Sequence, residues 1–176
     1  MNIKEKTELF KNVQLYIDKH LVLSAPDVMK CYEVSEFCQM RKFKSLAESD
    51  IDNLNKEIEN IDASFIDTIG EIIRKKDLKE PDVYKRAGFD RRFFSKMMNT
   101  PSYHPKKNTA LSFAIGLQLN INETKSLLAK AGYSLSPSSA TDIAVKYFIQ
   151  HKIYDIILIN EFLYSHDLSL LGSQDK

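Results

Sequence analysis

The chain has 176 residues, of which 43% are hydrophobic and 28% are charged, and its formal net charge is +1. This composition is typical of a folded globular protein, and the length allows a core that needs no disulfide or metal to hold it. Five glycines and five prolines are too few for the many turns of a β-rich fold, so we expect an all-α protein.

The first third of the chain predicts a helical N-terminal region over residues 1–60. Residues 3–21 place apolar side chains at helical spacing among lysines and glutamates, as an amphipathic helix does. Pro26 suits the first turn of a further helix, and less regular helical patterns follow over 26–47 and 49–61. The pattern assigns no role to this region.

A second region, expected at 61–172, begins with a sharper helix signal. Ser64 can cap a helix, and Phe65 and Ile69 lie on its apolar face. Three cations at 74–76 fall in its last turn, where the negative end of the helix dipole favours positive charge.

Two short helices follow. Pro81 opens the first, over 80–87, and Gly88 ends it as a left-handed residue after the helix C-terminus. Asp90 is placed to cap the second, over roughly 90–99.

Four more helices are expected beyond a loop bounded by Pro101 and Pro105. The first opens at Asn108 or Thr109, and Gly132 stops the second. A polar linker precedes the last two. The expected ranges are 108–117, 120–131, 140–150 and 155–165.

The two short helices and their turn form a helix-turn-helix pattern. Gly88 supplies a backbone conformation that only glycine adopts cheaply, and Phe89 would tuck into the core to fix the angle between the helices. Phe94 and Met97 are expected to face inward. The candidate DNA-binding residues are then Arg91, Arg92, Phe93, Ser95, Lys96, Asn99, Lys106 and Lys107.

Two stretches carry a family resemblance. Residues 83–97 read VYKRAGFDRRFFSKM, and residues 109–124, after Pro105, read TALSFAIGLQLNINET. With this spacing, residues 64–133 resemble the lambda-repressor-like, or XRE-type, helix-turn-helix domain. The resemblance implies a lambda-repressor-like helical bundle, here with an N-terminal helical extension and C-terminal helices. It also implies that the second helix of the pair meets DNA.

A narrower likeness extends to the C-terminal part. Lys130-Ala-Gly-Tyr-Ser-Leu-Ser-Pro-Ser-Ser, Ile153-Tyr-Asp-Ile and Ile159-Asn-Glu stand in this part of the chain. With them, residues 64–172 are similar to a bacterial module sometimes found downstream of macro, or ADP-ribose-binding, domains. That likeness implies an accessory component of a larger system.

Charge is concentrated around the helix-turn-helix pattern. Residues 74–107 hold eleven lysines and arginines against four acids, a net charge of +7, and the rest of the chain has −6. A basic segment in an otherwise acidic chain points to a polyanion partner, and a solvated surface is the alternative.

We therefore expect a DNA-binding regulator that contacts duplex DNA through residues 80–99. The alternative is a protein-interaction adaptor, or a defence or antitoxin-like component, that keeps the repressor fold without binding DNA. Glu80, Tyr84 and Phe93 favour this alternative, because the family often has a phosphate-binding glutamine, a small residue and a polar residue at these positions.

The C-terminal helices are strongly apolar, which leaves two interpretations open. They predict a homodimer or a protein partner, since large apolar patches rarely face water. They also fit a larger single core that the first helices join. The residues concerned are Ile143, Val145, Tyr147, Phe148, Ile149, Ile153, Tyr154, Ile156, Ile157, Leu158, Ile159, Phe162, Leu163, Leu168, Leu170 and Leu171.

No signature of catalysis or metal binding stands out, and we expect neither an enzyme nor a bound cofactor. Cys31 and Cys38 match no zinc pattern and are expected to be free thiols of a cytoplasmic protein. No apolar run approaches the ~20 residues of a membrane span. The histidines have no acidic or cysteine partners at ligand spacing.

Overall fold

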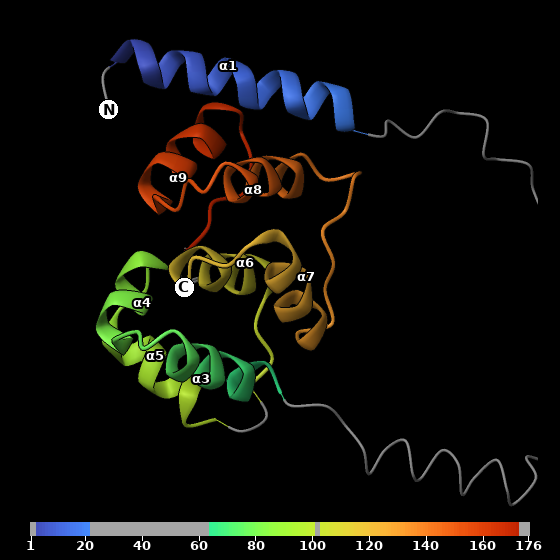
Figure 1. Cartoon of the computed structure of the whole chain (residues 1–176). Helices are drawn as coiled ribbons and strands as arrows, with labels where there is room; N and C mark the ends of the chain where they lie inside the picture. The colour runs from blue at the N-terminus through green and yellow to red at the C-terminus, as the bar shows by residue number, and fades with distance from the viewer. Residues whose placement is uncertain (1–2, 22–63, 101–102, 173–176) are drawn as a thin grey trace, which may run out of the picture. The chain divides into compact units, whose positions relative to one another are not determined.

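The computed structural model describes residues 3–21, 64–100 and 103–172. Within these ranges all regular structure is helical, with eight helices and no strand, which confirms the expected all-α class (Figure 1). The helices are α1 (Ile3–His20), α3 (Phe65–Lys75), α4 (Glu80–Arg86), α5 (Arg91–Met98), α6 (Lys107–Gly116), α7 (Ile121–Lys130), α8 (Ala140–Gln150) and α9 (Ile156–Ser165). None of these helices combines the length and the apolar character that crossing a bilayer requires.

α1, the described part of the expected N-terminal region, belongs to the same compact unit as α3 to α9. The reason is the apolar face of α1, where Val13 and Ile17 are buried in the core that α8 also lines. The helical patterns expected over 26–47 and 49–61 lie outside the described residues.

α6 lies at the centre of this unit. Every residue from 110 to 116 is buried, and a helix that is buried on all sides has to be surrounded by others. α4, α7 and α9 pack around it. α6 begins at Lys107, one residue before the expected opening at Asn108 or Thr109. The Asn108 side chain does not cap the helix, because its Nδ2 donates to the Leu170 carbonyl, 3.1 Å away.

An aromatic cluster joins α6 to the helix pair and to α3. The Phe113 ring is fully buried, and its centroid lies 5.1 Å from that of Phe89 and 6.1 Å from that of Phe94. Phe65, the first residue of α3, meets it edge-on at 6.3 Å. One side chain thus ties together four segments of the unit.

α4 and α6 approach each other closely at Gly116. A Cβ built on this glycine would lie 2.7 Å from the Val83 carbonyl oxygen and 2.8 Å from the Ala87 Cβ. Only a residue without a side chain allows this approach. The two helices therefore pack nearly backbone to backbone.

α1 lies across α8 and α9 (Figure 1). The Phe10 ring meets that of Phe162 at 5.3 Å, and the Tyr16 hydroxyl donates to Gln150 Oε1 at 2.8 Å. Lys6 forms an ion pair with Glu161. α1 therefore covers much of the apolar C-terminal part.

This packing bears on the apolar C-terminal helices. Most of the residues that suggested a dimer surface are buried within the unit and belong to a single larger core, whereas Ile157 is exposed. Among the described residues, the large hydrophobic side chains that remain exposed are Ile3, Leu15, Ile157 and Tyr164. A homodimer or a protein partner stays a prediction.

The segment after α9 returns to the turn between α4 and α5. Asn160 holds it with two hydrogen bonds to the backbone of Leu171, at 2.9 and 2.8 Å, and the Gly172 N–H donates to Ser112 Oγ at 2.7 Å. Gly172 has a φ of +69°, and a Cβ on it would lie 2.9 Å from the Ala87 carbonyl oxygen. The C-terminal segment is thus part of the support for this turn.

Candidate nucleic-acid interface

The turn between α4 and α5 has the local backbone geometry that the sequence predicts. Gly88 follows the C-terminus of α4 with a φ of +77°, and the Phe89 N–H donates back to the Tyr84 carbonyl at 2.8 Å. Asp90 Oδ1 then accepts from the Phe93 N–H at 2.7 Å and caps α5. The expected ranges of both helices are confirmed to within a residue at each end.

α5 has one face in the core and one face in solvent. Phe94 and Met97 are buried, as expected. The five exposed polar residues line a shallow hollow, which contains three cationic side chains and no acidic one. They are Arg91, Arg92, Ser95, Lys96 and Asn99.

Two of these polar residues already contact each other. Asn99 follows the last residue of α5, and its Nδ2 donates to the Ser95 carbonyl at 2.8 Å. Its amide group therefore covers the C-terminal end of the helix, and its oxygen is the atom left for another partner. Among the described residues, Arg91 and Arg92 have no such internal partner.

Phe93 differs from its predicted role at the outer face. The side chain is half-buried, and its ring stacks on Phe89 at 4.4 Å with 17° between the planes. Tyr103 meets it edge-on at 6.3 Å. Burial raises the pKa of the Tyr103 hydroxyl, an effect that the charge of Lys106 opposes. Phe93 therefore belongs to the packing of the turn.

Lys107, another predicted DNA-binding residue, has an acidic partner within the unit. Its ammonium group forms an ion pair with Asp142 of α8, whose side chain is buried. Asp142 Oδ2 also accepts the Ser136 N–H at 2.7 Å. The charge of Lys107 is thus balanced inside the unit.

Lys76 is a second cation of the basic segment with an acidic partner. Its Nζ lies 3.2 Å from Glu123 Oε2. The backbone N–H of Asn120 lowers the pKa of Glu123, and Lys76 lowers it further. Two of the eleven cations in residues 74–107, Lys76 and Lys107, are thus paired with acids, and both lie outside the helix pair.

Removing the Asp142 carboxylate is expected to destabilise the unit. Asp142→Ala leaves the Lys107 ammonium and the Ser136 N–H without their acceptor. Because Lys107 is partly in contact with solvent, we expect a loss of about 1–3 kcal/mol in the free energy of unfolding, below that of a fully buried pair. Urea unfolding followed by circular dichroism measures it. Glu8→Ala, at an exposed position of α1, is the control and should stay within about 0.5 kcal/mol. Equal effects of the two variants would contradict this account.

A second hollow of about 450 Å³ lies between α4 and α5, and Arg91, Ser95 and Asn99 line both hollows. The second hollow is lined by Glu80, Pro81, Tyr84, Arg91, Phe94, Ser95, Met98 and Asn99. Glu80 and Tyr84 thus lie beside the candidate interface.

The histidines have a structural role that the sequence analysis missed. At the C-termini of three helices, a histidine Nδ1 lies 2.8 Å from the carbonyl oxygen four residues earlier, and the ring stacks on the aromatic side chain of that residue. The pairs are His20 with Tyr16, His151 with Tyr147, and His166 with Phe162. Because a carbonyl only accepts, Nδ1 carries the proton. No group of three potential metal ligands occurs among the residues that the structure describes.

Comparison with known proteins adds no relative to this picture. No family model, no curated protein and no solved structure matches the chain. Any functional conclusion therefore depends on the geometry and charge of the site.

Proposed function

We propose that the chain is a DNA-binding regulator in which α4 and α5 act as a helix-turn-helix unit. The observation that carries the proposal is the outer face of α5, where five exposed polar residues include three cations and no acid, opposite a face buried in the core. An exposed helix of this kind fits the major groove of B-DNA, which is wide enough to admit it.

The residues of this face divide into two roles. Arg91 and Arg92, at the first two positions of α5, suit guanine edges or phosphates, because recognition helices contact bases with their N-terminal residues. Lys96 and the exposed Lys106 suit phosphates, which gives affinity without sequence preference. Ser95 and the Asn99 amide oxygen are left for polar contacts.

Replacing both arginines by glutamine is expected to weaken DNA binding by about 30- to 1,000-fold. Each arginine contact contributes on the order of 1–2 kcal/mol, and neither side chain supports the fold. The measurement is fluorescence anisotropy of a labelled duplex taken from the DNA upstream of the chain's own gene, at several salt concentrations. The salt slope should become shallower by about 0.9 for each phosphate contact that is lost.

The control variant carries Lys4→Gln and Lys11→Gln on α1. It removes the same charge from exposed positions outside the helix pair, so its affinity should stay close to that of the unchanged chain. A random duplex separates sequence preference from general attraction. Equal affinity of the arginine and lysine variants, or no binding at low salt, would refute the proposal.

A second candidate function is protein recognition through the same helix pair. The hollow between α4 and α5 combines Tyr84, Met98 and Glu80, which suits a peptide better than a phosphate backbone. Tyr84→Ala would then abolish binding of a protein partner, while Arg91 and Arg92 would matter less. DNA binding that is insensitive to Tyr84→Ala favours the first function.

A further inference from the structure

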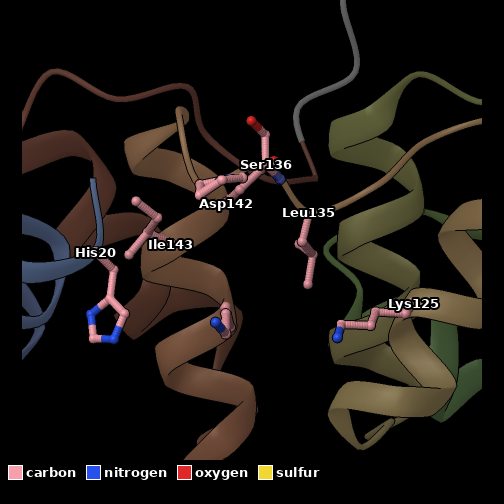
Figure 2. Close-up of a pocket in the computed structure, with 8 residues that line it drawn as sticks. His20, Lys125, Leu135, Ser136, Asp142 and Ile143 are labelled. Carbon is pink, nitrogen blue, oxygen red and sulfur yellow. Dashed lines mark hydrogen bonds between the residues drawn. The ribbon is translucent and has the colours of Figure 1, made fainter. Parts of the chain in front are cut away.

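A separate pocket of about 270 Å³ lies between α7 and α8 (Figure 2). It is formed by both helices, the linker that joins them and the last residue of α1. Its lining residues are His20, Lys125, Leu135, Ser136, Pro137, Asp142, Ile143 and Lys146. None of them belongs to the helix pair.

The polar groups of this pocket are unbalanced in favour of positive charge. Asp142 is the one carboxylate among its lining residues. It already forms an ion pair with Lys107 and accepts a hydrogen bond from the Ser136 N–H. Lys125 and Lys146 come from different helices, and neither has an acidic partner in the described part of the chain. Figure 2 shows Lys125 extending from α7 toward α8. Two ammonium groups are therefore available to an anion.

His20 adds a hydrogen-bonding atom to this set. Its Nδ1 is held by the Tyr16 carbonyl at 2.8 Å, and its ring stacks on Tyr16 at 4.0 Å. The ring orientation is thus fixed before any ligand arrives. With the proton on Nδ1, Nε2 is an acceptor for a ligand hydroxyl, such as the P–OH of a singly ionised phosphate group.

The rest of the lining is apolar. Ile143 is buried on α8, and Leu135, half-buried, lies between the two helices in Figure 2. Pro137 completes this wall. A ligand that matches the pocket therefore combines an anionic group with a small apolar body.

We propose that this pocket binds a small organic phosphomonoester. A phosphomonoester carries about −1.5 to −2 charges at neutral pH. Two lysines therefore match a phosphate group better than they would match a carboxylate ligand, which has a single negative charge. The volume lies just under the ~300–1,000 Å³ of pockets for drug-sized ligands, so the apolar body has to be small. The inference does not depend on the proposed DNA contact.

Isothermal titration of the full chain with phenyl phosphate tests the proposal. We expect saturable binding with a Kd below about 1 mM, and a loss of about tenfold or more in the variant with Lys125→Gln and Lys146→Gln. The variant with Lys4→Gln and Lys11→Gln loses the same charge outside the pocket and should bind as the unchanged chain does. Circular dichroism checks that each variant is folded.

Two further measurements test whether binding occurs in this pocket and whether it needs both the phosphate group and the apolar body of the ligand. The variant with Arg91→Gln and Arg92→Gln should keep its affinity, which also separates this result from a failure of the proposed function. Inorganic phosphate and benzyl alcohol should each bind more weakly than phenyl phosphate. No binding at about 10 mM, equal affinity in the Lys125 and Lys146 variant, or loss on changing the arginines would overturn the proposal.

Discussion

Replacing Gly116 with alanine is expected to lower the free energy of unfolding by about 2 kcal/mol or more. The new Cβ would lie 2.7 Å from the Val83 carbonyl oxygen and 3.0 Å from the Ala87 nitrogen. Both are backbone atoms, which cannot rotate away as the end of a side chain can. α4 therefore has to move off α6, and an overpacked core of this kind typically loses about 1–3 kcal/mol, occasionally more. Alanine's better helix propensity, about 1 kcal/mol, offsets part of this loss.

Gly70→Ala is the matched control, because it makes the same change inside another helix. The nearest atom to its added Cβ is the Met98 Cε, 3.8 Å away, which is ordinary contact with a flexible side chain. This variant should be unchanged or more stable by up to about 1 kcal/mol. Guanidinium unfolding of the two variants should therefore give shifts of opposite sign. Equal stability would show that α4 and α6 do not pack as described.

Phe113→Ala is the second change with a large expected effect, a loss of about 3–5 kcal/mol. The side chain is fully buried, and its ring contacts Phe65, Phe89 and Phe94. Because these neighbours come from three different segments, they cannot close the cavity together. Thermal unfolding followed by circular dichroism measures the loss.

Two variants calibrate this result. Phe113→Leu keeps most of the apolar volume and should lose clearly less than the alanine variant. Tyr164→Ala removes an aromatic ring from an exposed position of α9 and should change stability by no more than about 0.5 kcal/mol. A Phe113→Ala variant as stable as Tyr164→Ala would contradict the central place of this ring.

The sequence predicted most accurately the features that depend on residues close together in the chain, such as helix caps and turns. Ser64 and Asp90 cap their helices through residues three positions later, and Gly88 ends α4 with its own backbone. These contacts need no knowledge of the rest of the chain. The inward positions of Phe94 and Met97 follow from helical spacing in the same way.

What the sequence could not supply were contacts between distant segments. Lys107 meets Asp142 across 35 positions, so a count of local charge placed it with the free cations. The packing of α1 on α8 is equally remote along the chain, and the apolar C-terminus therefore admitted two interpretations. The Lys125 and Lys146 pocket has no sequence signal, because its residues come from four segments.

One missed feature did have a signal. An aromatic residue precedes each of three histidines by four positions, and each pair lies at the end of a helix. Side chains four apart share a helix face, so the pattern indicates a ring stacked on a ring with its nitrogen at a free carbonyl.

The return of the C-terminal segment to the α4–α5 turn has a consequence for how the molecule folds. Gly172 reaches Ser112 across 60 positions, and the turn that it covers begins at Ala87. The chain must close this long loop before the turn has its final surroundings, and closures of that kind slow folding. A fragment that stopped after α7 would form its helices early, yet its turn would stay open to water and exchange its amide hydrogens rapidly.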